Sequence, residues 1–176
     1  MEINEILKRI DNSIKSVLEN EYDILERGLN EPNLTGHLTK YLTPYFEEVT
    51  IDPEYNGDKL KDSDRKALEI ARNRIIEIGM SPNKTDNYQL TPDIIIHQRN
   101  TNNNNLVVIE VKKDNNSKNR KDFDLLKLEH MTIDYNGNHY NYRIGIAIVF
   151  GTKKRAGKYE IYYFQNGMPT KRENLK

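Results

Sequence analysis

The sequence contains no cysteine among its 176 residues, which excludes disulfide bonds, thiolate zinc sites and cysteine nucleophiles. Any bound metal must therefore be held by oxygen or imidazole ligands. The sequence also lacks an apolar run long enough to cross a bilayer, and its first residues lack the basic-then-apolar layout of a secretion signal. We therefore expect a cytoplasmic protein that does not associate with membranes.

The chain has no net charge of either sign, because 27 lysine and arginine residues balance 27 aspartate and glutamate residues. Overall charge therefore does not indicate a polyanionic partner, and any contact with nucleic acid must be local. Residues 112–121 and 153–155 are basic enough for such a contact, although basic loops are more often only solvated. The sequence also lacks a glycine-rich phosphate loop, a serine-nucleophile elbow and histidines at metal-ligand spacing.

The hydrophobic pattern predicts one α/β (α+β) domain over residues 1–176, with a central mixed sheet of four to five strands flanked by helices. Periodicity near 3.6 residues predicts helices at 3–25, 31–45, 67–78 and 123–131, and short β-branched or alternating runs predict strands at 48–52, 94–96, 106–112, 142–150 and 159–164. Residues 1–28 form a helical extension that packs on the core or on a partner. Residues 54–88, which include the helix at 67–78, form an insertion after the first strand.

Three charged residues stand in or beside the most apolar strands. Asp93 precedes the run Ile94-Ile95-Ile96, and Glu110 and Lys112 end the run that begins at Leu106. In an antiparallel hairpin, the numbers of two paired residues always add up to the same sum, which is twice the number at the centre of the loop. A loop centred near residue 102 therefore places Asp93 opposite a residue from Glu110 to Lys112. Side chains alternate between the faces of a strand, so Glu110 and Lys112 share one face.

Two interpretations of these charges remain open from the residues alone. Charged groups among apolar side chains are costly unless they are paired or bind an ion, so they form either a salt bridge at a strand end or a site for a divalent cation. Magnesium prefers carboxylate oxygens and retained waters, which suits phosphodiester hydrolysis. Asp64-Arg65-Lys66 is the other acid-x-lysine triplet, and its polar surroundings predict a surface location.

The segments Pro92-Asp93 and Glu110-Val111-Lys112 resemble the signature of the PD-(D/E)xK nuclease superfamily, which has the restriction-endonuclease-like fold. That family has a three-layer core in the order αβββαβ, which is similar to the elements predicted from residue 31 to residue 150. Here the resemblance implies an extra amino-terminal helix and a helical insertion after the first strand. Its first core helix often carries a glutamate that faces the site, and the segment beginning at Glu31 looks like that helix.

The resemblance implies a role for each matching residue. Asp93, Glu110 and the backbone carbonyl of Val111 would bind Mg²⁺ or Mn²⁺, Lys112 would be the catalytic lysine, and Glu31 would be an accessory acid and an additional metal ligand. Glu26 is the reserve candidate for the accessory acid. An acid at a helix start is also favoured by the helix dipole whatever its function.

The function predicted from the resemblance is metal-dependent hydrolysis of nucleic acid, with DNA preferred over RNA as the substrate. Such an enzyme would suit bacterial defence or a mobile element. The alternative is a catalytically silent module of the same fold that binds nucleic acid or protein. In either case, the amino-terminal helix is the candidate surface for a homodimer or a partner protein.

Overall fold

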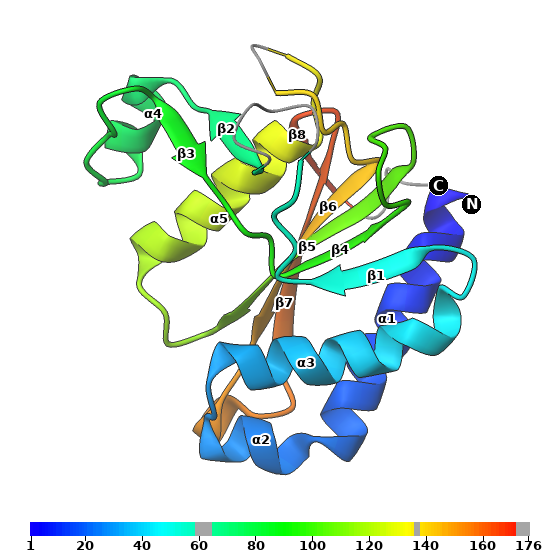
Figure 1. Cartoon of the computed structure of the whole chain (residues 1–176). Helices are drawn as coiled ribbons and strands as arrows, with labels where there is room; N and C mark the ends of the chain where they lie inside the picture. The colour runs from blue at the N-terminus through cyan, green and yellow to red at the C-terminus, as the bar shows by residue number, and fades with distance from the viewer. Residues whose placement is uncertain (59–64, 136–137, 172–176) are drawn as a thin grey trace.

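In a computed structural model, the chain forms a mixed α/β fold with a six-stranded central sheet (Figure 1). The structure describes residues 1–58, 65–135 and 138–171. Sheet order is β1-β4-β5-β6-β7-β8, and β5 and β6 are its only parallel neighbours among the described strands. The strands are β1 (Thr50–Pro53), β4 (Ile94–His97), β5 (Asn105–Lys113), β6 (Ile144–Phe150), β7 (Tyr159–Gln165) and β8 (Met168–Thr170).

Five α-helices and two short 3-10 helices surround this sheet in the described part of the chain. They are α1 (Ile3–Asn20), α2 (Tyr22–Arg27), α3 (Glu31–Leu42), η1 (Thr43–Tyr45), α4 (Arg72–Glu77), α5 (Lys118–Met131) and η2 (Lys153–Arg155). A small second sheet pairs β2 (Ala67–Glu69) with β3 (Asn87–Gln89). None of the helices in the described residues is long and apolar enough to span a membrane.

The two faces of the central sheet bury two separate hydrophobic cores. Ile94, Ile96 and Ile109 pack with the apolar sides of α1 and α3, whereas Ile95 and Val108 pack with α5 and the β2 to β3 segment. This alternation follows from the two-residue period of a strand. Because both faces are covered, β4, β5 and β6 are apolar along almost their entire length.

The predicted hairpin of β4 and β5 is confirmed, with Ile94 paired to Ile109 and Ile96 to Val107. A β-bulge shifts the pairing between Ile96 and His97. The parallel pairing of β5 with β6 requires a crossover connection, which α5 provides. This arrangement brings the start of β4, the end of β5 and the inner side of α5 together.

The predicted helix over 3–25 is wrong in its continuity, because α1 ends at Asn20 and α2 begins at Tyr22. At the break, the Glu21 carboxylate accepts a hydrogen bond from the Tyr41 hydroxyl at 2.7 Å and lies 2.9 Å from His37 Nδ1. Both partners belong to α3, so tertiary contacts accompany the break. The buried side of α1 packs in the core beside α3.

The predicted helix over 67–78 is also wrong in part. Residues 67–69 form strand β2, and the helix is limited to Arg72–Glu77. Distant side chains bind the backbone of β2, since the Ala67 N–H donates to the Tyr140 hydroxyl and the Glu69 N–H to Asn138 Oδ1. These long-range hydrogen bonds favour an extended backbone where local periodicity indicated a helix.

Three smaller predictions also need correction. The sheet has six strands instead of four or five, because β8 adds a short edge strand. Lys66 is buried, although its triplet was predicted to lie on the surface; Asp64 of that triplet lies outside the described residues. Residues 59–64 of the predicted insertion also lie outside them, whereas residues 65–88 contain β2, α4 and β3.

Candidate functional site

The side chains of Glu31, Asp93, Glu110 and Lys112 gather around the carboxyl end of β5. The Lys112 ammonium Nζ lies 3.4 Å from Glu31 Oε2 and 3.4 Å from Asp93 Oδ2. Glu110 precedes Lys112 by two residues on the same strand, so both side chains lie on the same face. The structure therefore brings together residues that are up to 81 positions apart in the sequence.

The local structure around Glu31 explains its position at this cluster. Asn30 caps α3 by accepting a hydrogen bond from the Asn33 N–H at 3.2 Å, and Pro32 occupies the first turn, where its missing N–H costs nothing. Leu34 and Leu38 are buried on the core side of α3. Because this side of the helix is anchored, the Glu31 carboxylate is directed to the end of β5, where Asn116 Nδ2 donates a hydrogen bond to it.

Asp93 is fixed in the cluster by the backbone of the neighbouring strand. Its Oδ2 atom accepts a hydrogen bond from the Val111 N–H at 2.7 Å and also lies near Lys112. Continuing the hairpin register by one residue pairs Asp93 with Glu110, which lies within the predicted range from Glu110 to Lys112. Strand pairing and the hydrogen bond from the Val111 N–H thus position Asp93 beside Glu110.

Helix α5 contributes two further charged residues that the sequence analysis missed, Asp124 and Lys127. Lys127 Nζ lies 2.8 Å from Glu110 Oε1 and 2.7 Å from Asp124 Oδ1, and Asp124 Oδ2 lies 3.3 Å from Lys112 Nζ. Both residues are buried. Their three-residue spacing inside an apolar helical stretch was the signal available in the sequence, since it places an acid and a base on one helix face.

Burial raises the pKa of the Glu110 carboxyl to about 8. The positive charge of Lys127 lowers this pKa, whereas the negative charges of Asp93 and Asp124 raise it. The desolvation effect is the largest because the Glu110 side chain is almost completely inaccessible to solvent. Glu110 therefore holds its proton more tightly than an exposed glutamate does.

The two lysines carry the positive charge of the cluster. Burial alone lowers the pKa of Lys112, but Asp93, Asp124, Glu110 and Glu31 together raise it well above its usual range. The pKa of Lys127 is raised in the same way, with Glu110 and Asp124 outweighing the opposing effect of burial. Both side chains therefore remain ammonium ions at physiological pH, so neither is suited to accept a proton.

The donor atoms of the cluster fit a hard divalent cation in their chemistry. Carboxylate oxygens from Asp93, Glu110 and Glu31 and the carbonyl oxygen of Val111 are the ligands that Mg²⁺ and Mn²⁺ prefer. The Val111 carbonyl accepts a hydrogen bond from Lys112 Nζ at 3.1 Å. Within the described ranges, no three histidine or acidic side chains are already spaced to hold a metal, and the lysine ammonium groups lie between the carboxylates.

The reserve candidate Glu26 and the histidine at the end of β4, His97, lie outside the cluster. The reserve acid Glu26 is on the exposed side of α2, and none of the contacts described for the cluster includes it. His97 ends β4 and is buried, with Nε2 at 2.9 Å from Asp52 Oδ2. Glu31, not Glu26, is therefore the acid that the tertiary structure places beside Lys112.

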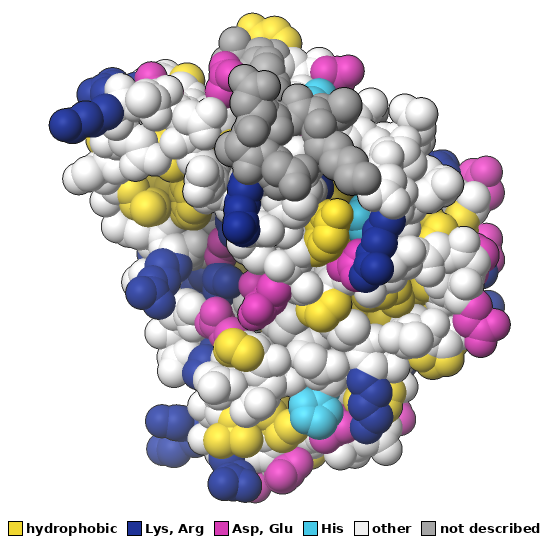
Figure 2. Space-filling model, viewed as in Figure 1, with side chains coloured by type: hydrophobic (Ala, Val, Ile, Leu, Met, Phe, Trp, Pro, Cys, Tyr) yellow, Lys and Arg dark blue, Asp and Glu magenta, His cyan; other side chains and the backbone are white. Residues whose placement is uncertain are grey.

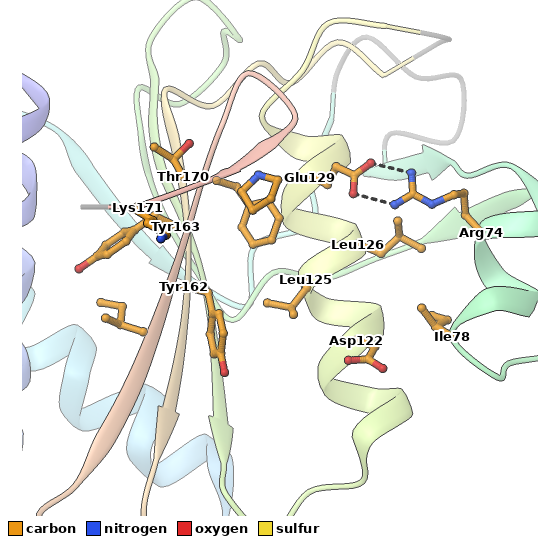
Figure 3. A pocket seen from close by; sticks show the side chains of 13 residues that line it. Arg74, Ile78, Asp122, Leu125, Leu126, Glu129, Tyr162, Tyr163, Thr170 and Lys171 are labelled. Atoms are coloured by element: carbon orange, nitrogen blue, oxygen red, sulfur yellow. Dashed lines mark hydrogen bonds and ion pairs between the residues drawn. The ribbon is translucent and has the colours of Figure 1, made fainter. Parts of the chain in front are cut away.

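A separate cavity of about 880 Å³ lies between α5 and the β7 to β8 hairpin. Figure 3 shows Leu125 and Tyr162 along its walls and the Arg74–Glu129 ion pair at its edge. The cluster consists of six charged side chains, those of Glu31, Asp93, Glu110, Lys112, Asp124 and Lys127. None of them lines this cavity. The cluster and the cavity thus involve different sides of α5, and the size of the cavity has no bearing on the charged site.

Comparisons with protein-family models, with curated proteins and with solved structures returned no match for this chain. The chemistry of the site must therefore be inferred from its own six charged residues.

Proposed function

We propose that this chain is a metal-dependent nuclease with a restriction-endonuclease-like core, hydrolysing phosphodiester bonds in DNA, with RNA as the second candidate substrate. The supporting observation is the convergence of Glu31, Asp93 and Glu110 on Lys112 at one end of a buried hairpin. Buried charge is costly, and six ionisable groups from three parts of the chain at one site suggest a chemical role. The order of α3, β1, β4, β5, α5 and β6 is compatible with that core.

In this proposal, the carboxylates of Asp93 and Glu110 and the carbonyl of Val111 hold Mg²⁺ or Mn²⁺, with Glu31 as an additional ligand. The bound ion would supply a Lewis acid and a water molecule of lowered pKa. Lys112 contributes a fixed positive charge, because its raised pKa keeps it protonated. It is therefore suited to stabilise negative charge that develops on the phosphate, instead of removing a proton from water.

Asp124 and Lys127 have a positioning role in the same proposal. Asp124 contacts both lysines, and Lys127 contacts Glu110. These ion pairs restrict the side chains of Lys112 and Glu110, which are the groups that would touch the metal or the phosphate. Binding of a divalent cation would replace part of the positive charge that Lys127 now supplies to Glu110.

A second candidate function is a catalytically silent module of the same fold. The specific observation that favours it is that Lys112 and Lys127 already pair with all four carboxylates of the cluster. Such a network can be a structural salt-bridge cluster, although buried ion pairs contribute little net stability. Titration calorimetry separates the two functions, since only the nuclease requires Mg²⁺ or Mn²⁺ binding that disappears in Asp93→Ala.

The decisive experiment measures cleavage of labelled single-stranded and double-stranded DNA and RNA with Mg²⁺ or Mn²⁺. We expect Lys112→Ala to lower the rate by about 100-fold or more, the effect of removing one charge-stabilising group. Lys15→Ala on the exposed side of α1 is the matched control and should retain full activity. Full activity of a folded Lys112→Ala protein would refute the proposed role of this residue.

A further inference from the structure

The positive charge of this neutral chain is unevenly distributed. Residues 113–121 and 152–158 together contain eight lysine or arginine residues and one acid, Asp114. The eight are Lys113, Lys118, Arg120, Lys121, Lys153, Lys154, Arg155 and Lys158, and we call them the basic surface. All of them are exposed or half-buried.

The fold brings the two basic segments together at one edge of the sheet. Strands β5 and β6 are parallel and end side by side, with Lys113 paired to Phe150, so the segments that follow them leave from the same edge. Asp114 joins these segments, because its Oδ1 atom accepts hydrogen bonds from the Thr152 N–H at 3.1 Å and the Thr152 hydroxyl at 2.8 Å. One acid thus links the segment that leads into α5 to the segment that leads into η2.

The basic surface adjoins the carboxylate cluster. A cavity of about 550 Å³ is lined by Glu31 of the cluster and by Lys113 and Arg120 of the basic surface. On the face seen in Figure 2, dark blue side chains lie around a group of magenta acidic side chains left of the centre. A ligand that extends from the cluster would therefore meet positive charge.

Most of these charges are not neutralised by the protein. Arg155 lies near Asp114 and Glu160, at 3.7 Å and 3.3 Å. Within residues 1–58, 65–135 and 138–171, no ion pair involves Lys118, Arg120, Lys153 or Lys154. Four exposed cations on adjoining segments raise the local positive potential and so attract anionic ligands.

We infer that the basic surface binds the phosphodiester backbone of a nucleic acid and aligns it with the carboxylate cluster. Exposed lysine and arginine side chains contact phosphates without reading base sequence. Binding is therefore independent of sequence and strongly dependent on salt. The identity of this partner rests on the proposed nuclease function, whereas the binding itself does not require cleavage.

The test measures binding of the full chain to a fluorescent 20-base-pair DNA duplex and to a single-stranded RNA of mixed sequence, in EDTA to prevent cleavage. Two charge reversals, Lys153→Glu/Lys154→Glu and Lys118→Glu/Arg120→Glu, alter one segment each. We expect each pair to weaken binding at least about 10-fold and to reduce the salt slope by about 2. Lys8→Glu/Lys15→Glu on α1 makes the same change in net charge and should weaken binding by less than about 2-fold. Circular dichroism verifies that all variants are folded.

The binding of the variants and of the wild type decides whether the basic surface contacts nucleic acid. Weakening by both reversals and not by the control supports the inference, and the nucleic acid that binds more tightly identifies the backbone. An effect of one pair only, equal effects of the control, or no binding by the wild type to either probe overturns it. Binding without any cleavage in Mg²⁺ or Mn²⁺ would leave the basic surface in place and refute the nuclease function instead.

Discussion

Glu110 is expected to make the metal affinity of this protein depend strongly on pH. Its carboxyl group has a pKa of about 8 in the folded, metal-free chain because it is buried, and a metal ion binds only the deprotonated form. The ionised fraction of Glu110 therefore increases as the pH rises towards that value. Affinity for Mn²⁺ or Mg²⁺ should therefore rise at least about 10-fold in all from pH 6 through pH 7 to pH 8, and less steeply from pH 8 to pH 9.

Isothermal titration calorimetry with Mn²⁺ at these four pH values measures the effect directly. At pH 7, titrations in buffers of different ionisation enthalpy should reveal the release of about one proton per metal ion. Glu110→Gln should bind weakly and lose the steep dependence. Glu129→Gln, which alters an acid of α5 that pairs with Arg74 outside the cluster, should retain it. Equal wild-type affinity at pH 6 and pH 8 would refute the assignment of Glu110 as a ligand with a raised pKa.

The same pKa has a consequence for the stability of the metal-free protein. Between about pH 4.5 and pH 8, the folded chain retains a proton on Glu110 that the unfolded chain has lost. The Glu110 contribution to the free energy of unfolding is therefore largest below this range and falls as pH rises through it. Glu110→Gln should flatten this part of the pH profile when denaturation is measured in EDTA.

Three further predictions concern the framework of the site. Tyr140→Phe should lower the free energy of unfolding by about 1–3 kcal/mol, because the buried Tyr140 hydroxyl bonds to Asp58 and to the backbone of β2. Tyr142→Phe should change the free energy of unfolding by less than about 0.5 kcal/mol, because no described group bonds to the buried Tyr142 hydroxyl. Equal losses of stability for the two variants in chemical denaturation would contradict this assignment. Leu38→Ala should cost about 2–5 kcal/mol in thermal unfolding, since Leu38 is fully buried between α3 and the sheet, and a loss below 1 kcal/mol would argue against that packing. Hydrogen bonding to Arg99 lowers the pKa of Asp52, so the stabilising effect of the ionised Asp52 is present above about pH 4 and is lost as pH falls through the folded pKa. Asp52→Asn should therefore lower the free energy of unfolding by about 1 kcal/mol at pH 7 and by much less at pH 2. Urea titrations at the two pH values measure this difference.

The sequence predicted the central hairpin well because its signals are local. The β-branched runs before and after the polar loop at 98–104 define two buried strands, and the observed pairing of Ile94 with Ile109 is one of the registers that the constant-sum rule allowed. The capping pattern of Asn30 and Pro32 similarly predicted the start of α3. The prediction failed at residues 67–69, where the backbone N–H groups of Ala67 and Glu69 donate hydrogen bonds to the side chains of Tyr140 and Asn138 and favour a strand. Such partners are about 70 residues away and leave no local pattern.

For the site, the sequence by itself determined that Glu110 and Lys112 share a face and that Asp93 lies beside them, because strand alternation and hairpin register are short-range geometry. Only the tertiary structure decided that Asp124 and Lys127 complete the cluster and that the segments at 113–121 and 152–158 form one basic surface. These outcomes depend on how α5 packs across the sheet and on the parallel pairing of β5 with β6. The physical reason is that the ionisation of Glu110 and the local concentration of positive charge depend on distances between side chains from different elements, which no one-dimensional pattern specifies.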